Sequence, residues 1–140
     1  MAVGNTFGAT ALSSYGGFWL AYGTLFHPYF DIFNSLHTAE GEPAVIYSPE
    51  QRFSAVGFFL TGWFIFTTLL LLCTLKSTVM FFMLFFTLDL AFLFLACENY
   101  AASMGKTSAQ EGLQTAGGVF GMLAAFLAWY NALAGIQDNA

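Results

Sequence analysis

The stretch Phe53–Leu75, FSAVGFFLTGWFIFTTLLLLCTL, and the stretch Thr78–Cys97, TVMFFMLFFTLDLAFLFLAC, together decide the fold of this chain. Both are unbroken apolar runs, and about 20 apolar residues in a helix cross the hydrocarbon layer of a bilayer. Only helices and closed barrels satisfy the backbone in lipid, and continuous runs without alternation favour helices. Because the turn around Lys76 is very short, the two helices must run antiparallel, side by side.

Two further apolar runs, at about residues 7–26 and 113–134, bring the expected membrane helices to four. The predicted fold class is therefore all-α, a polytopic transmembrane helix bundle in which the whole chain forms a single membrane domain. Residues 27–50 are the one long extramembrane loop and hold all three prolines and both histidines. At the end of this loop, Ser48 suits the cap and Pro49 the first position of the next helix.

The composition excludes most classes of soluble protein. Charged residues make up 8% of the chain and hydrophobic residues 58%, whereas an average soluble domain has about 25% charged residues. The chain has no basic patch that would hold nucleic acid, and no nucleophile–base pair, phosphate-binding loop or metal-ligand spacing that would indicate an enzyme, a cofactor or a metal site. Cys73 and Cys97 form no CxxC pair and are expected to be inert thiols. Membrane lipids are the expected surroundings.

The first apolar run differs from the others in its many small and hydroxyl-bearing residues. Small residues let helices approach closely, and hydroxyls bond across helices or line a wet path. Neutral donors can bind a small carboxylate without trapping it, so these side chains are candidates for a substrate path. Interhelical hydrogen bonding or capping is the alternative. The candidates, with one amide from the end of the third run, are Asn5, Thr6, Thr10, Ser13, Ser14 and Asn99.

A single acid, Asp89, falls near the middle of the third run. A carboxylate at mid-bilayer costs about 2.5–3.5 kcal/mol on insertion scales, and acids there usually mark proton or ion paths. Asp89 is therefore a proton-relay candidate. The alternative is a protonated carboxyl that bonds a neighbouring helix, such as a hydroxyl of the first run. Glu98 lies at the end of the run and is expected to reach lipid headgroups or water.

Two local patterns are predicted for the last helix. A stripe of small residues, including the GxxxG pair Gly117 and Gly121, indicates a close helix contact within the protomer or between protomers. The sequence Ser108-Ala109-Gln110-Glu111 has the form of a capping box, which predicts that the helix begins there. The full stripe is Gly117, Gly121, Ala124, Ala128 and Ala132.

Two segments resemble a known family. The segment GNTFGATALSSYGGFWL, Gly4–Leu20, is similar to the signature of the acetate uptake transporters, also called the acetate/succinate transporters, and AWYNALAGIQD, Ala128–Asp138, resembles their fungal branch. The Thr74–Lys76 turn also fits, and the resemblance covers essentially the whole chain. It implies a six-helix fold with both termini in the cytoplasm. This chain matches the third to sixth helices and lacks the first two and the NPAPLGL motif before them.

The resemblance also implies an assembly, a location and a constriction. Family members form homo-hexamers with one path per protomer, and the fungal branch suggests the plasma membrane. Their narrow hydrophobic constriction contains a Tyr that matches Tyr15 and a Leu that matches Leu88 by counting from the Thr74–Lys76 turn. The third member, a Phe of the first helix, has no counterpart in this chain.

The function implied by the resemblance is passage of acetate or a similar short monocarboxylate across a membrane, proton-linked or channel-like, and not enzyme catalysis. Two alternatives stay open. The chain is a truncated, non-conducting subunit of a hexameric assembly, or it transports or exports ammonium. The sequence is rich in aromatic residues but shows no clear cage for a cation, which ranks ammonium below a carboxylate.

Overall fold

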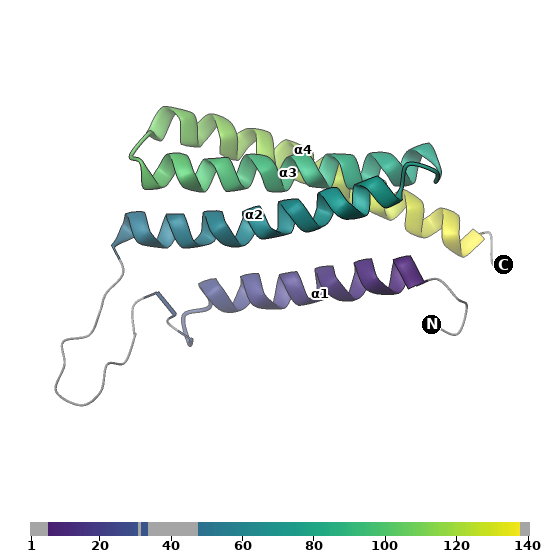
Figure 1. The fold of residues 1–140 in the computed structure, drawn as a ribbon, viewed down its shortest axis with the longest axis horizontal. Helices are drawn as coiled ribbons and strands as arrows, with labels where there is room; N and C mark the ends of the chain where they lie inside the picture. Colours follow the sequence, from purple (N-terminus) through teal and green to yellow (C-terminus); the bar gives the residue numbers. More distant parts are fainter. Residues whose placement is uncertain (1–5, 31, 34–47, 138–140) are drawn as a thin grey trace. The chain divides into compact units, whose positions relative to one another are not determined.

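The computed structural model describes residues 6–30, 32–33 and 48–137, and within these residues it has four α-helices and no strand (Figure 1). The helices are α1 (Thr6–Phe26), α2 (Pro49–Cys73), α3 (Val79–Ser103) and α4 (Thr107–Gln137). The all-α class is confirmed. The chain divides after Ser48 into two units, with α1 in the first and the other three helices in the second.

Three helices, α2, α3 and α4, are long and apolar enough to cross a membrane. Helix α1 is not among them, because its Gly, Ser and Thr residues dilute its apolar side chains. That α1 spans the bilayer stays a prediction. The helices of the second unit also extend beyond the predicted runs, since α3 continues past Cys97 to Ser103 and α4 begins at Thr107.

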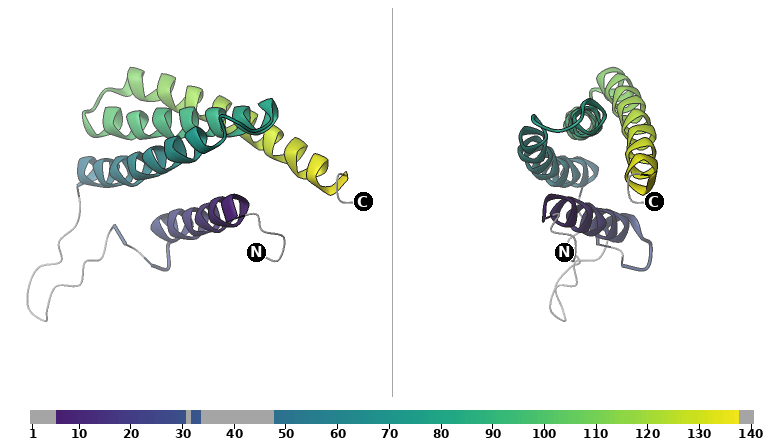
Figure 2. Two further views of the ribbon diagram at one scale, coloured as in Figure 1. Left: turned by 45° about the vertical axis from the view of Figure 1, so that its right-hand side comes forward. Right: turned by 90° about the vertical axis from the view of Figure 1, so that its right-hand side faces the viewer.

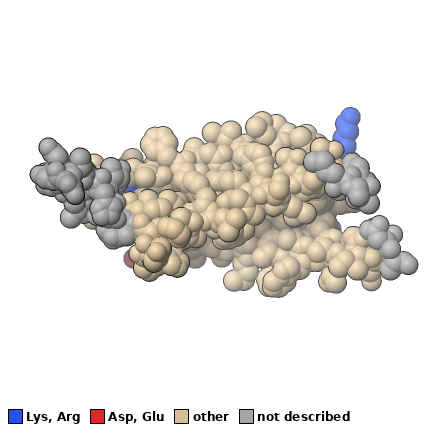
Figure 3. Space-filling model, turned by 90° about the horizontal axis from the view of Figure 1, so that it is seen from below, with Lys and Arg blue, Asp and Glu red and all other residues tan. Residues whose placement is uncertain are grey.

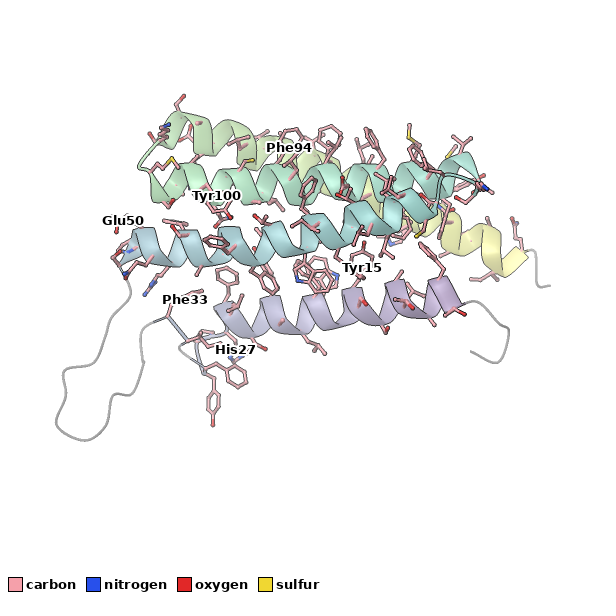
Figure 4. All side chains as sticks on the ribbon, viewed as in Figure 1. Tyr15, His27, Phe33, Glu50, Phe94 and Tyr100 are labelled. Carbon is pink, nitrogen blue, oxygen red and sulfur yellow. The ribbon has the colours of Figure 1, made fainter. Side chains whose placement is uncertain are left out.

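The first unit consists of α1 and the turn that follows it. The Phe30 backbone N–H donates to the His27 carbonyl (3.1 Å), and the Tyr29 backbone N–H donates to His27 Nδ1 (3.1 Å). Because Nδ1 accepts this bond, the neutral imidazole carries its proton on Nε2. His27 is labelled in Figure 4, just beyond the end of α1. Its predicted loop companion, His37, lies outside the described residues.

The α2–α3 hairpin is built from local signals. Helix α2 begins at Pro49, as predicted, and proline suits this position because the first helical N–H has no intrahelical acceptor. After Cys73 the chain turns: the Ser77 N–H donates to the Thr74 carbonyl at 2.8 Å. Thr78 then caps α3, accepting from the Phe81 N–H at 3.3 Å. The antiparallel pairing expected for so short a turn follows.

The α3–α4 hairpin turns on Gly105. Its φ of +69° is the left-handed conformation that glycine adopts without steric cost. The Gly105 N–H donates to the Ala102 carbonyl (3.0 Å) and the Lys106 N–H to the Ala101 carbonyl (2.9 Å), which is the bonding pattern of a Schellman cap. The predicted capping box is wrong, because Thr107 already belongs to α4 and Ser108 therefore lies inside the first turn.

Helix α3 lies between α2 and α4 and contacts both (Figures 1 and 2). On the α2 side, Phe92 stacks on Trp63 at a ring-centroid distance of 6.5 Å. On the α4 side, Phe94 stacks on Phe120 at 5.4 Å. Two glycines permit the closest approaches: a Cβ on Gly57 would stand 2.8 Å from the Tyr100 ring, and a Cβ on Gly117 would stand 2.8 Å from Leu95.

The small-residue stripe of α4 makes part of the predicted contact. Gly117 and Ala124 are buried, and a Cβ on Gly117 would meet the Leu95 side chain. A Cβ on Gly121 would meet nothing within 4 Å. The close contact therefore lies within the chain, between α3 and α4. It is made by Gly117 and Ala124, which are seven residues apart, and not by the predicted GxxxG pair Gly117 and Gly121.

Charged side chains are confined almost entirely to the ends of the helices. In the face seen in Figure 3, blue and red side chains come into view only near the ends, and the helix surfaces between them are uncharged. The outward face of α4 exposes large apolar side chains along most of its length, including Met122, Phe126 and Leu133. An apolar surface of this kind suits lipid.

Two polar contacts fasten α3 to α4 near opposite ends of the pair. Asn131 Nδ2 donates to the Met80 carbonyl at 3.3 Å, and Gln110 Nε2 donates to Glu98 Oε1 at 3.2 Å. On α3 these contacts are separated by roughly 27 Å at 1.5 Å per residue. We call these two contacts the polar pins.

Candidate functional site

Asp89 lies at the middle of α3 and is 8% exposed. In sequence it is equally far from Met80 and Glu98, the two α3 residues of the polar pins, which places it roughly 13–14 Å along the axis from each. Its Oδ1 is 2.9 Å from Thr68 Oγ1 on α2. Among the described residues this is the one hydrogen bond to the Asp89 carboxyl. The predicted bond to a neighbouring helix is therefore present, but with α2.

Thr68 has two acceptors within reach of a single hydroxyl proton. Its Oγ1 is 2.9 Å from the Phe64 carbonyl of its own helix and 2.9 Å from Asp89 Oδ1. A threonine hydroxyl donates once and can accept as well. With an ionised carboxyl, Thr68 Oγ1 donates to Asp89 Oδ1 and shares its one proton with the Phe64 carbonyl, whereas a protonated carboxyl that donates to Thr68 Oγ1 gives each contact a proton of its own.

A second polar contact joins α2 and α3 toward the other end of their seam. Tyr100 Oη is 3.0 Å from Thr61 Oγ1, and Thr61 Oγ1 donates to the Gly57 carbonyl at 2.8 Å. The Tyr100 ring lies over Gly57 and meets Phe58 edge to face at 6.0 Å. Figure 4 shows Tyr100 on α3, directed toward α2. Sequence analysis did not single out Tyr100 or Thr61.

Glu98 was predicted to reach lipid headgroups or water. It is instead buried between α3 and α4, with 8% of its surface exposed. Its Oε2 accepts from Asn99 Nδ2 at 2.8 Å and its Oε1 from Gln110 Nε2 at 3.2 Å. Asn99 Nδ2 also donates to the Leu95 carbonyl at 2.8 Å. The prediction for Glu98 is wrong because α3 continues, buried, beyond the end of its apolar run. Asn99, a path candidate, is thus committed to Glu98 and the α3 backbone.

A signal for the Glu98–Gln110 pair was present in the sequence. The two residues stand equally far, in opposite directions, from Met104 at the turn. In an antiparallel hairpin, residues at equal distances from the turn face each other. Counting outward from Met104 would have paired them.

Two of the candidate hydroxyls on α1, those of Thr10 and Ser13, bond within their own helix. Thr10 Oγ1 donates to the Thr6 carbonyl at 2.9 Å, and Ser13 Oγ donates to the Ala9 carbonyl at 2.7 Å. A carboxylate substrate accepts hydrogen bonds only, so these hydroxyls would have to turn from the carbonyls to bind one. Such a turn is a side-chain rotation and leaves the helix intact. Asn5 lies outside the described residues.

Leu88 and Asp89 occupy different faces of α3. Leu88 is seven residues from Leu95, whose side chain meets Gly117 of α4, so both leucines lie on one face of α3. Asp89 is turned about 100° from Leu88 and faces α2. Tyr15 and Ser14 are carried by α1, in the other unit, and the meeting of Tyr15 with Leu88 in a constriction stays a prediction.

The described residues contain no group of three or more His, Cys, Asp or Glu side chains that could hold a metal ion. The polar side chains that the structure does bring together are neutral hydroxyls and amides around single carboxyls. Their chemistry is hydrogen bonding and proton exchange, and covalent catalysis has no nucleophile–base pair in this set.

The whole chain, residues 1–140, matches the profile of the GPR1/FUN34/yaaH family. The chain belongs to this family. It is 53% identical to acetate permease A of Emericella nidulans over 141 aligned residues, which cover 100% of this chain and 45% of the permease. The resemblance of the two sequence segments to fungal acetate transporters is thereby confirmed.

More distant members carry two kinds of name. Ammonia transport outward protein 2 of Saccharomyces cerevisiae is 45% identical over 99% of this chain and 44% of its own length. Acetate transporter protein patA of Aspergillus clavatus is 28% identical over 91% of this chain and 48% of its own length. The chain spans about half the length of these relatives. No solved structure matches the chain.

Proposed function

We propose that this chain serves the passage of acetate or a similar short monocarboxylate across a membrane, in a proton-linked or channel-like manner. The observation that carries the proposal is its 53% identity, over its full length, to acetate permease A. The three apolar helices supply the membrane-embedded scaffold such passage requires. Acetic acid has a pKa close to that of Glu, about 4.3, so at neutral pH the anion dominates and needs a protein path.

Tyr15, Leu88, the hydroxyls of α1 and Asp89 each have a role in this proposal. Tyr15 and Leu88 narrow the path, and the hydroxyls of α1 offer donors to the carboxylate. Asp89 relays the accompanying proton. The assembly is a homo-hexamer in the plasma membrane of a fungus, and the chain performs no catalysis. The relatives' names, permease and transporter, support the last point.

Flux into lipid vesicles tests the proposal. The chain is reconstituted and uptake of labelled acetate is measured against an outward or inward pH gradient. Tyr15→Ala and Leu88→Ala are expected to change the rate and its selectivity for acetate over longer carboxylates. Matched controls are Tyr22→Ala on α1 and Leu93→Ala on α3. The proposal would be ruled out if the reconstituted chain gave no acetate flux and its co-assembly with acetate permease A gave no flux beyond that of the permease alone.

The co-assembly arm also decides the subunit alternative. A truncated, non-conducting subunit is expected to co-purify with the full-length permease and to add no flux of its own. If the chain conducts by itself, this alternative is excluded. Acetate flux measured on the same vesicles therefore distinguishes a conducting chain from a non-conducting subunit.

Ammonium transport or export is the second candidate, favoured by the 45% identity to ammonia transport outward protein 2. The same vesicles loaded with ammonium and a pH-sensitive dye distinguish it. Loss of ammonia from the lumen acidifies the interior, whereas acetate entry as the acid acidifies it only when acetate is added outside. Acidification of the vesicle interior in the absence of external acetate would favour ammonium transport or export.

A further inference from the structure

The described helices place no cationic side chain near Asp89. On α2 no charged residue lies between Arg52 and Lys76, and the described part of α4 has none after Glu111. Helix α1 has none between Thr6 and Phe26. An isolated carboxylate in an apolar medium is too costly to persist, and the group neutralises by taking a proton.

The other titratable side chains of the packed helices lie far from the centre of the seam. On α2 they are Glu50 and Arg52 near the start and Cys73 at the end; on α4 they are Glu111 and Tyr130 near its two ends. On α3 itself, Cys97, Glu98 and Tyr100 lie at least two turns beyond Asp89.

The hydrogen-bond geometry fits a protonated carboxyl. With a proton on the carboxyl, Asp89 donates to Thr68 Oγ1, and Thr68 donates to the Phe64 carbonyl; both 2.9 Å contacts are then satisfied. Without that proton, the Thr68 hydroxyl turns to the carboxylate. The Phe64 carbonyl then keeps only its helical partner, which costs little because that bond is unaffected.

We propose that Asp89 and Thr68 together form a proton-binding site at mid-depth between α2 and α3. The ligand is a single proton, held on the Asp89 carboxyl and shared with Thr68 Oγ1. Binding forms one O–H bond on Asp89 and breaks one in a hydronium ion, which leaves water, or in a carboxylic acid in the path, which leaves its carboxylate. Release returns the proton to water or to a carboxylate. Thr68 is the positioning residue of the pair.

This site deepens the proton link of the proposed function, yet its test needs no transport. The chain is reconstituted in phosphatidylcholine vesicles and its infrared difference spectrum is recorded across a pH series. A protonated carboxyl gives a C=O stretching band apart from the amide bands. Asp89→Asn is expected to remove that band, and Glu98→Gln controls its assignment.

Thr68 is then tested against a matched control. Thr68→Val is expected to move the band and the midpoint of its titration, and Thr68→Ser is expected to restore both. Thr87→Val is the control, because Thr87 is a buried threonine whose hydroxyl bonds only the Met83 and Leu84 carbonyls of α3. Circular dichroism confirms that each variant keeps its helices.

Two outcomes overturn the inference. One is a spectrum in which Asp89→Asn removes no carboxyl band at any pH, which means that the carboxyl never holds a proton. The other is a Thr68→Val band that coincides in position and midpoint with that of Thr87→Val. Loss of acetate flux with the band intact would refute the proposed function alone, so the two failures are distinguishable.

Discussion

Substituting Gly57 by alanine tests the closest approach between α2 and α3. The added Cβ would stand 2.8 Å from Tyr100 Cε1, 3.0 Å from Cδ1 and 3.1 Å from Cζ. The ring cannot turn away cheaply, because its hydroxyl is 3.0 Å from Thr61 Oγ1 and its edge meets Phe58. The helices must therefore move apart or the Tyr100–Thr61 contact must break.

The magnitude follows from three terms. Overpacking of this kind costs about 1–3 kcal/mol, and an interhelical hydrogen bond in a membrane protein is worth about 0.6 kcal/mol. Alanine also gains about 1 kcal/mol of helix propensity over glycine. Gly62→Ala on the same helix gains the helix propensity without the overpacking, since a Cβ there meets nothing within 4 Å. We expect Gly57→Ala to be less stable than Gly62→Ala by about 1.5–3.5 kcal/mol.

Unfolding in mixed micelles measures the difference. The fraction of dodecyl sulfate in dodecyl maltoside is raised, and helix loss is followed by circular dichroism. Tryptophan fluorescence is followed as well, to which Trp63 contributes from its stack on Phe92 between α2 and α3. The Gly57→Ala midpoint should fall at a lower sulfate fraction than that of Gly62→Ala. Coincident midpoints would show that Tyr100 does not rest on Gly57 and would refute the packing described for α2 and α3.

Three further substitutions have expected outcomes in the same assay. Gly117→Ala should destabilise the α3·α4 pair by about 1–2 kcal/mol relative to Gly118→Ala, because its Cβ would meet Leu95 whereas that of Gly118 meets nothing; equal midpoints would contradict this. Gly105→Ala should cost about 1–2 kcal/mol, since its φ of +69° is unfavourable for a residue with a Cβ; an unchanged midpoint would show that the turn is not left-handed. Glu98→Ala should cost about 1–3 kcal/mol by removing the acceptor of buried amide donors, and Glu98→Gln less; the reverse order of the two would contradict the bonding.

The helices were predictable because the bilayer imposes a local requirement. A run such as Phe53–Leu75 has to be helical wherever its neighbours lie, since lipid offers no partner for its backbone. The antiparallel hairpin followed from the short turn at Lys76, and the start of α2 from the proline at position 49. None of these inferences needed a tertiary contact.

The ends of α3 and α4 were not predictable from hydropathy. Glu98 and Asn99 look like loop residues when each is read alone, but they are buried because Gln110 returns across the turn to meet them. Pairing of this kind depends on the Schellman cap at Gly105, whose hydrogen bonds carry no hydropathy signal. The same is true of the helix start at Thr107.

The sequence predicted that Asp89 would bond a neighbouring helix and offered a hydroxyl of the first apolar run as one example, whereas the bond is made with Thr68 of α2. The number of donors on a helix does not fix which face it presents. Thr68 and Asp89 lie at similar distances on either side of the Lys76–Thr78 turn, so the antiparallel register brings them together.

The polar pins give the protein a preferred membrane thickness. The two contacts lie roughly 27 Å apart along α3. They join Asn131 to Met80 and Glu98 to Gln110. This length is close to the hydrocarbon depth of about 30 Å of an ordinary bilayer. Lipids with longer acyl tails would draw both pins into oil at once, whereas shorter tails would expose the apolar residues beside them. Tail length therefore becomes an experimental control over how tightly α3 and α4 hold together.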